Sequence, residues 1–321
     1  MTVYVGHDKC WRQFSTASDS GKVHHSWILA GPKGLGKSVF ALRAAAALVD
    51  PDNNHSTLIE RGTHPDILWV RRLAKDADKD DGEAGEAAEF KRSITVDQIR
   101  SLQQSLTTRP GLSNRRAIII DAADDLERGG ANALLKSLEE PPVGTFFFLV
   151  SHASDRLLPT IRSRCQILRF DPLSDSEMTD IVRDAAPEAG ARDIETLVRI
   201  SKGAPGQALD FIGLDLGKME DAMMAIIRTG DRSNALRSAL AEQLSLKSAQ
   251  PRYEAFLRRA PALIAERTRQ LRTKQLPQGV DAWEAASSLA GRAIALSLDR
   301  QSVVFQMGSL LASVEAHKAT V

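Results

Sequence analysis

A glycine-rich segment restricts this chain to few folds. It reads Gly31-Pro32-Lys33-Gly34-Leu35-Gly36-Lys37-Ser38, matches G-x-x-x-x-G-K-[ST], and lies between an apolar run and a helical pattern. This context predicts a phosphate-binding loop, because glycines let backbone N–H groups surround phosphate oxygens at a helix N-terminus. We expect Lys37 to reach the β- and γ-phosphates of ATP, and Ser38 to ligate Mg²⁺. The alternative is a glycine-rich turn that no longer binds nucleotide.

Short apolar runs alternate with helix-like segments from residue 26 to residue 170. This alternation is typical of strands buried on both faces of a mainly parallel sheet, with helices as crossovers on either side. The predicted fold class is therefore a doubly wound α/β domain. The expected strands are 26–30, 66–70, 116–121, 145–151 and 166–170, and the expected helices are 37–49, 96–106 and 131–140.

The strand signals stop after Pro172, and the rest of the chain is predicted to be helical. Because 321 residues exceed what one core usually organises, we expect several domains. The predicted division is an α/β domain at 1–170, a small helical domain at 171–213 and a larger helical domain at 214–321. The expected helices include 174–185, 193–201, 206–212, 252–270, 282–298 and 302–317.

Two segments carry weaker signals. Residues 75–89, KDADKDDGEAGEAAE, are acidic and lack a large apolar side chain, so a mobile loop is expected there. In the last domain, the side chains expected in the hydrophobic core include Phe256, Leu257, Ile264, Trp283 and Leu289. The alternative interpretation makes Trp283 and Phe305 exposed side chains that anchor a partner protein.

Composition argues against several classes of protein. The formal net charge of +1 provides no global attraction for nucleic acid or an anionic membrane, so any DNA contact requires a local patch. The longest apolar run, 146–150, is too short to cross a bilayer, and the first residues lack a signal-peptide pattern. Cys10 and Cys165 are too few for a disulfide framework. A cytoplasmic protein is expected.

A second element of a nucleotide site is expected at the end of the strand 116–121. Asp121 is predicted to hold Mg²⁺ through water, but the next residue is Ala122, where an AAA+-type ATPase has a glutamate that orients the attacking water. Nucleotide binding without efficient hydrolysis is therefore predicted. Asp124 or Asp125 could replace the glutamate, although a solvated acidic turn or helix start is the preferred interpretation.

Several blocks of sequence, in the correct order, resemble a known family. Residues 121–124 (DAAD), 131–142 (ANALLKSLEEPP) and 158–165 (LPTIRSRC) are similar to the bacterial clamp-loader subunits, namely the tau/gamma ATPase and its relative delta-prime. Shorter blocks at 25–31, 64–66 and 94–100 fit the same family. The resemblance covers about residues 6–170. It implies an AAA+-type domain, a helical lid and a helical collar that joins a five-membered ring.

The resemblance gives Arg164, in Ser163-Arg164-Cys165, a role in catalysis. In the family this arginine projects toward ATP in a neighbouring subunit and neutralises charge that develops on the γ-phosphate. Such arginine fingers are worth roughly 10³ to 10⁵ in rate. The alternative interpretation makes Arg164 a surface ion-pair residue.

Departures from the family pattern favour delta-prime over the tau/gamma motor. Ala122 replaces the water-orienting glutamate. Gly206 stands where the motor has an arginine that reads the bound nucleotide, and Ser151-His152-Ala153 replaces a threonine-containing turn. The losses concern hydrolysis in this chain, whereas Arg164, which would act on a neighbour, is retained.

The same comparison predicts that no zinc is bound. Both subunit types commonly carry a four-cysteine zinc module at the place of residues 50–63, and this segment contains no cysteine. His55 and His64 alone are too few ligands for a structural zinc site.

The resemblance implies a subunit of the DNA polymerase III clamp loader, with tau/gamma and delta as partner subunits. Through the complex it would help load the sliding clamp (beta) onto primed DNA, with weak or absent ATPase activity of its own. Its DNA contacts are expected to be few and weakened by salt. One alternative is the tau/gamma-type motor. Another is a P-loop kinase for a small molecule, which explains neither Ser163-Arg164-Cys165 nor the helical last third.

Overall fold

The computed structural model describes residues 6–74 and 91–314. The chain divides into two compact units, Met1–Glu177 with Gly203–Gly206, and Met178–Lys202 with Gln207–Val321. The finer division into three domains remains a prediction. The loop predicted at 75–89 lies outside the described residues.

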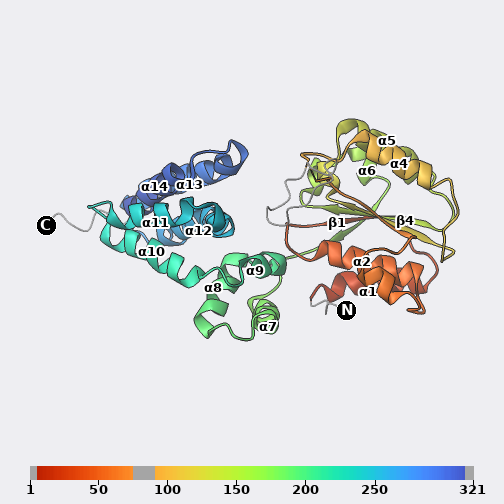
Figure 1. The fold of residues 1–321 in the computed structure, drawn as a ribbon, viewed down its shortest axis with the longest axis horizontal. Helices are drawn as coiled ribbons and strands as arrows, with labels where there is room; N and C mark the ends of the chain where they lie inside the picture. The colour runs from red at the N-terminus through yellow and green to blue at the C-terminus, as the bar shows by residue number, and fades with distance from the viewer. Residues whose placement is uncertain (1–5, 75–90, 315–321) are drawn as a thin grey trace. The chain divides into compact units, whose positions relative to one another are not determined.

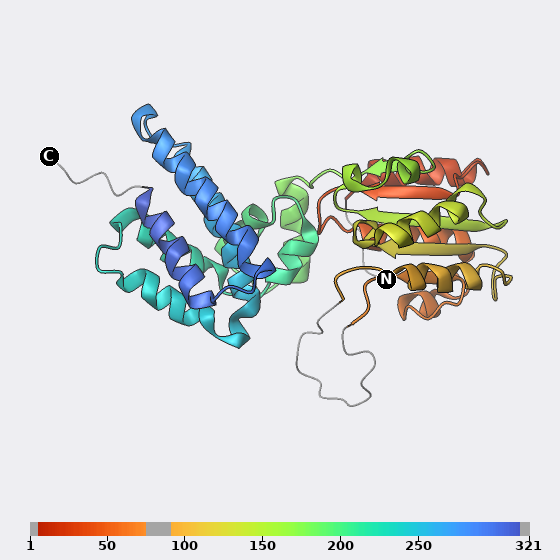
Figure 2. The same ribbon diagram turned by 90° about the horizontal axis from the view of Figure 1, so that it is seen from above.

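The first unit is built on a five-stranded parallel sheet, seen edge-on in Figure 1 and from above in Figure 2. Its strand order is β2-β3-β4-β1-β5. The three inner strands are buried almost throughout, which explains why they are continuous apolar runs rather than alternating ones. The strands are β1 (Ser26–Ala30), β2 (Ile67–Val70), β3 (Arg116–Asp121), β4 (Thr145–Ser151) and β5 (Gln166–Arg169). The predicted fold class is confirmed.

Helices cover both faces of this sheet and create two separate cores (Figure 1). Successive side chains of a strand point to opposite faces, so Trp27 and Leu29 pack on one side and Ile28 and Ala30 on the other. On the first side lie α1 (Asp8–Asp19) and α2 (Lys37–Val49), and on the second α4 (Val96–Ser105), α5 (Arg128–Glu139) and α6 (Pro159–Arg162). Three helices, α1, α6 and the short α3 (Ser56–Glu60), were not predicted from the sequence.

Local sequence fixes the start of α4. Thr95 and Gln98 form a capping box, in which Thr95 Oγ1 accepts from the Gln98 N–H at 3.4 Å and Gln98 Oε1 accepts from the Thr95 N–H at 3.1 Å. Two backbone donors that a helix start leaves open are thereby satisfied. The helix therefore begins at Val96, as predicted.

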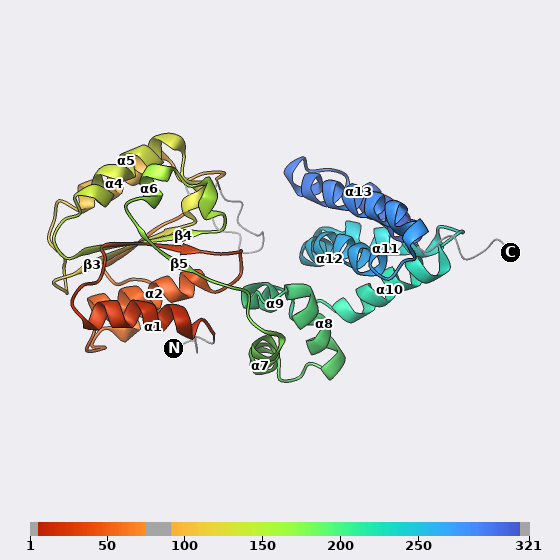
Figure 3. The same cartoon turned by 180° about the vertical axis from the view of Figure 1, so that it is seen from behind.

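The described part of the second unit is helical (Figure 3). In it α11 packs against α14, and α12 packs against α13. Two of the boundaries between the units fall inside helices. Glu177 is followed by Met178 of the other unit within α7, and Gly206 by Gln207 of the other unit within α9. The helices are α7 (Asp175–Ala185), α8 (Ala191–Ser201), α9 (Pro205–Phe211), α10 (Leu216–Thr229), α11 (Ala235–Ser245), α12 (Gln250–Thr268), α13 (Leu276–Ala295) and α14 (Arg300–Ser313). No described helix combines the length and the apolar character that crossing a membrane requires.

One predicted core residue is on the surface instead. Phe256, Leu257, Ile264 and Leu289 are buried as expected, but the side chain of Trp283 is 42% exposed. The buried side of α13 is a stripe at helical spacing, Ala282, Ala286, Leu289 and Ala293, and Trp283 lies one residue off this stripe. Its expected core position was wrong. Trp283 and Phe305 are both exposed, and their role as partner anchors stays a prediction.

Candidate nucleotide site and the surface arginine

Sheet topology brings the predicted nucleotide-site residues to one edge. Strands β3, β4 and β1 are neighbours and parallel, so their carboxyl ends meet, as in other open α/β sheets that bind ligands there. Ala30 pairs in register with Ser151, and Asp121 with Val150. The glycine-rich loop after Ala30 therefore lies beside Asp121 and the turn after β4.

The backbone of the loop requires glycine at specific positions. Gly34 and Gly36 have φ of 89° and 76°, which side chains with a Cβ rarely adopt. At Gly31 an added Cβ would lie 2.4 Å from the Phe170 carbonyl oxygen. The α2 helix starts directly after Gly36, so the positive end of a 13-residue helix faces the loop. The loop thus has the backbone that a phosphate site needs.

Lys37, Ser38 and Asp121 come together as the sequence predicts. The Lys37 ammonium is buried and donates to the carbonyl oxygens of Gly31 at 2.6 Å and Pro32 at 2.5 Å. Burial lowers the pKa of Lys37 to about 8, although the negative charges of Asp121 and Asp124 favour its protonated form. Ser38 Oγ donates to Asp121 Oδ2 at 2.7 Å.

These residues fit a magnesium nucleotide. A hydroxyl and a carboxylate in contact are the oxygen ligands that Mg²⁺ prefers. The acceptors of the Lys37 ammonium are the neutral carbonyl oxygens of Gly31 and Pro32, and a negatively charged phosphate oxygen can replace them with a stronger bond. Pro32 and Lys33 are exposed on the loop, whereas Leu35 is buried in the core beneath it.

Two residues from outside the loop bind its backbone, and neither role was predicted from the sequence. His7 Nε2 donates to the Leu35 carbonyl oxygen at 2.9 Å, and the Gly206 N–H donates to the Gly34 carbonyl oxygen at 2.8 Å. Burial lowers the pKa of His152, and the charge of Lys37 lowers it further. His7 precedes the first helix, and the sequence around it contains no motif that would have identified its role. His152, directly after β4, could have been found from its place at the end of an inner strand.

The two acidic residues considered as replacements for a glutamate at Ala122 have structural contacts. Asp124 accepts hydrogen bonds from Ser151 Oγ at 2.9 Å, the His152 N–H at 2.7 Å and the Ala153 N–H at 3.1 Å. Asp125 pairs with the Arg72 Nε at 3.1 Å. Ala122 itself is buried. Asp124 therefore holds the turn after β4 against the end of β3.

Arg164 lies between α6 and β5 on the surface of the first unit. Its Nη1 donates to the Thr160 carbonyl oxygen at 2.8 Å and to Ser163 Oγ at 3.3 Å, and its Nη2 forms an ion pair with Glu139. The side chain is 33% exposed. The ion pair of the alternative interpretation is thus present, and the role as a finger stays a prediction.

The block at 64–66 and the segment before it have structural contacts in this chain. The buried Asp66 carboxylate accepts from the N–H groups of Gly111, Leu112 and Ser113 at 2.6 to 2.9 Å. Asp50 accepts from the Asn54 and His55 N–H groups. Within residues 6–74 and 91–314, no group of three or more His, Cys, Asp or Glu side chains could hold a metal ion. The absence of zinc remains an expectation.

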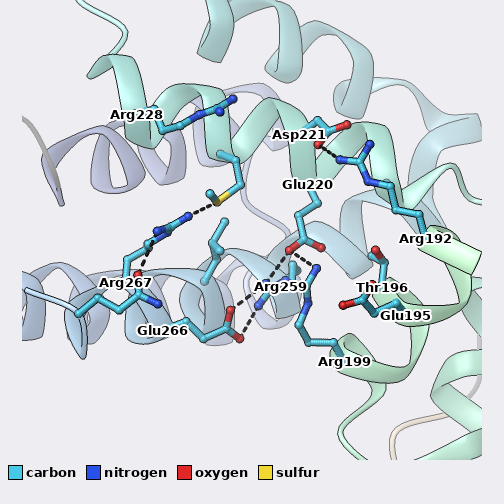
Figure 4. A pocket seen from close by; sticks show the side chains of 14 residues that line it. Arg192, Glu195, Thr196, Arg199, Glu220, Asp221, Arg228, Arg259, Glu266 and Arg267 are labelled. Atoms are coloured by element: carbon cyan, nitrogen blue, oxygen red, sulfur yellow. Dashed lines mark hydrogen bonds and ion pairs between the residues drawn. The ribbon is translucent and has the colours of Figure 1, made fainter. Parts of the chain in front are cut away.

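A charged cavity of about 400 Å³ lies in the second unit between α8, α10 and α12 (Figure 4). At its centre the buried Arg259 bonds Glu220 at 2.7 Å and Glu266 at 2.7 and 2.9 Å. Arg199 bonds the same Glu220 oxygen at 2.6 Å. Burial would raise the pKa of Glu266, but its bonds with Arg259 lower it. Because the positive charges of Arg199 and Arg259 offset those of Glu220 and Glu266, we interpret the cluster as a structural ion network, although Glu220 Oε2 and Arg259 Nε have no hydrogen-bond partner among the described residues.

A family model and several known proteins match this chain. Residues 6–174 match the model of the family described as "DNA polymerase III, delta subunit". The chain is similar to the delta' subunit of DNA polymerase III from Pseudomonas aeruginosa, with 32% identity over 61% of this chain and 58% of that protein. The Escherichia coli delta' subunit is 30% identical over 59% of this chain and 55% of that protein.

A gamma subunit is also similar. The DNA polymerase III subunit gamma from Buchnera aphidicola subsp. Schizaphis graminum is 29% identical over 65% of this chain and 56% of that protein. The chain therefore spans little more than half the length of each of these relatives.

Proposed function

Because the chain belongs to the DNA polymerase III delta subunit family, we propose that it is a delta-prime-type clamp-loader subunit whose active contribution is made in trans. The proposal rests on a contrast between two sites in the first unit. The phosphate loop and the Ser38–Asp121 pair are complete, but the next residue is the buried Ala122, which cannot orient water. The side chain of Arg164, in contrast, is partly exposed at the surface.

In this proposal the chain holds MgATP without turning it over efficiently. The bound nucleotide would supply phosphate charge and a metal ion. Lys37 and the start of α2 would bind the phosphates, and Ser38 and Asp121 would hold the metal. Asp124 keeps the turn after β4 in place and takes no part in the chemistry.

Arg164 acts on ATP held by a neighbouring tau/gamma subunit. A guanidinium is positively charged and has several donors, so an arginine is suited to neutralise charge on a γ-phosphate. The ring would also contain delta. It would load the sliding clamp onto primed DNA in the cytoplasm.

The experiment that tests this role is Arg164→Ala in a reconstituted clamp loader. We expect the ring to assemble normally and its DNA- and clamp-stimulated ATP hydrolysis to fall at least tenfold, because an arginine finger is worth roughly 10³ to 10⁵ in rate. Arg162→Ala is the matched control, because Arg162 is a nearby surface arginine paired with Asp155 at 3.3 Å. Unchanged hydrolysis with Arg164→Ala would exclude the finger.

A gamma-type motor is the second candidate, because the glycine-rich loop is complete and a gamma subunit is among the relatives. ATP binding and hydrolysis by the purified chain, with Lys37→Ala as control, separate the two. Binding without turnover supports the delta-prime-type role, and robust turnover lost in the control supports the motor.

A further inference from the structure

Glu139 occupies a position that helix electrostatics disfavour. It is the last residue of α5, and Glu140 follows as the cap, so two carboxylates lie at the negative end of the helix dipole. Lys136 is the basic residue in that last turn. Of the two carboxylates, Glu139 has an ion pair, and its partner is Arg164 on the segment between α6 and β5. An unfavourable local placement is thus combined with a contact to the proposed finger.

The guanidinium of Arg164 is occupied by its own chain. Nη2 pairs with Glu139, and Nη1 donates to Thr160 and Ser163. A γ-phosphate of a neighbouring subunit would compete for these same N–H groups, because an arginine binds phosphate and carboxylate through one donor fork. An arginine has five N–H donors, and the Nη2 donors that face Glu139 can bind the neighbour's nucleotide only after this ion pair opens.

We propose that Glu139 is a positioning residue that restrains Arg164 on its own subunit until a neighbour's γ-phosphate displaces it. The proposal rests on the trans role proposed above and adds its regulation. Both side chains are partly exposed, at 33% for Arg164 and 47% for Glu139, so the restraint is weak and reversible. A weak restraint suppresses hydrolysis in the idle ring, and the assembled complex overcomes it.

The decisive variant is Glu139→Gln in the reconstituted clamp loader. We expect hydrolysis without DNA and clamp to rise about twofold to fivefold, the range of an exposed ion pair, while the fully stimulated rate stays unchanged. Glu139→Asp should act more weakly. Glu140→Gln removes the adjacent charge without touching Arg164 and should leave both rates unchanged. Equal or lower unstimulated hydrolysis with Glu139→Gln would overturn the proposal.

A second readout avoids hydrolysis altogether. Modification by phenylglyoxal, followed by mass spectrometry on the full isolated chain, reports how accessible each arginine is. Glu139→Gln should raise the initial rate at Arg164 about twofold to fivefold, whereas Arg162, paired with Asp155, serves as internal reference. An unchanged ratio of the two rates would contradict the restraint.

The two proposals fail in different ways. If Arg164→Ala leaves stimulated hydrolysis intact, the finger is excluded, whatever the modification rates show. If Arg164→Ala reduces hydrolysis but Glu139→Gln changes neither readout, the finger stands and the restraint is excluded. The double variant Glu139→Gln/Arg164→Ala should equal Arg164→Ala, because Glu139 acts only through Arg164.

Discussion

Ser38 and Asp121 connect the two halves of the nucleotide site, since Ser38 Oγ donates to Asp121 Oδ2 at 2.7 Å. Asp121→Asn keeps an acceptor for this bond but removes the charge that attracts Mg²⁺. We expect ATP affinity in Mg²⁺ to fall roughly tenfold, as for loss of one interaction with a charged group. In EDTA the variant and the parent should bind equally. Titration calorimetry in both buffers measures these affinities. Equal affinities of the variant and the parent in Mg²⁺ would show that Asp121 does not help to hold the metal.

ATP affinity should depend on pH through Lys37. Its pKa is lowered to about 8 by burial, so below pH 8 the ammonium is charged before ATP binds. Above pH 8 binding must first take up a proton, and affinity should fall by up to about tenfold per pH unit. Lys37→Arg stays charged and should bind with little change between pH 7.5 and 9.5. A flat profile for the parent chain would show that Lys37 does not meet the phosphates.

Asp124 should matter for stability rather than chemistry. Asp124→Asn loses a carboxylate that accepts from Ser151, His152 and Ala153, and we expect unfolding free energy to fall by about 1–3 kcal/mol. Asp125→Asn breaks only a half-exposed pair with Arg72 and should cost less than about 1 kcal/mol. Urea unfolding compares the two. An Asp124→Asn chain with an unchanged free energy of unfolding would contradict this structural role.

Within the ion network of the second unit, replacement of Arg259 should lower the free energy of unfolding the most. Arg259→Ala leaves Glu220 and Glu266 without their buried partner, and we expect the free energy of unfolding to fall by about 3–5 kcal/mol. Arg192→Ala removes an exposed pair with Asp221 and should cost less than about 1 kcal/mol. Thermal unfolding of the full chain distinguishes them. Similar melting temperatures for both variants would show that the network is not structural.

Strand positions were predictable because these strands carry their signal locally. All five were predicted to within one residue, and the three inner strands are mainly apolar runs because both of their faces are buried. The α1 helix was not predicted, although Cys10, Phe14 and Ala17 recur at helical spacing. Trp283 was assigned to the core because its residue type, rather than its place on α13, determined the expectation.

The candidate site was predictable only where its residues share a motif. The motif predicts the roles of Lys37 and Ser38, and the strand before Asp121 predicts its place beside them. The hydrogen bonds from the turn after β4 to Asp124 join residues 27 to 29 positions apart in sequence, and the ion pair of Arg164 with Glu139 joins residues 25 apart. Such pairs depend on sheet order and loop path, which apolar periodicity does not encode.

Cys165 directly follows Arg164, and burial raises the pKa of its thiol to about 12. Burial also raises the pKa of Cys10, whose Sγ donates to the Arg169 carbonyl oxygen at 3.2 Å. Only the thiolate reacts readily with maleimides, so both native thiols are poor targets near neutral pH. Val143, fully exposed before β4, offers a site for an added cysteine. A fluorophore could therefore be attached there selectively, with both native cysteines retained.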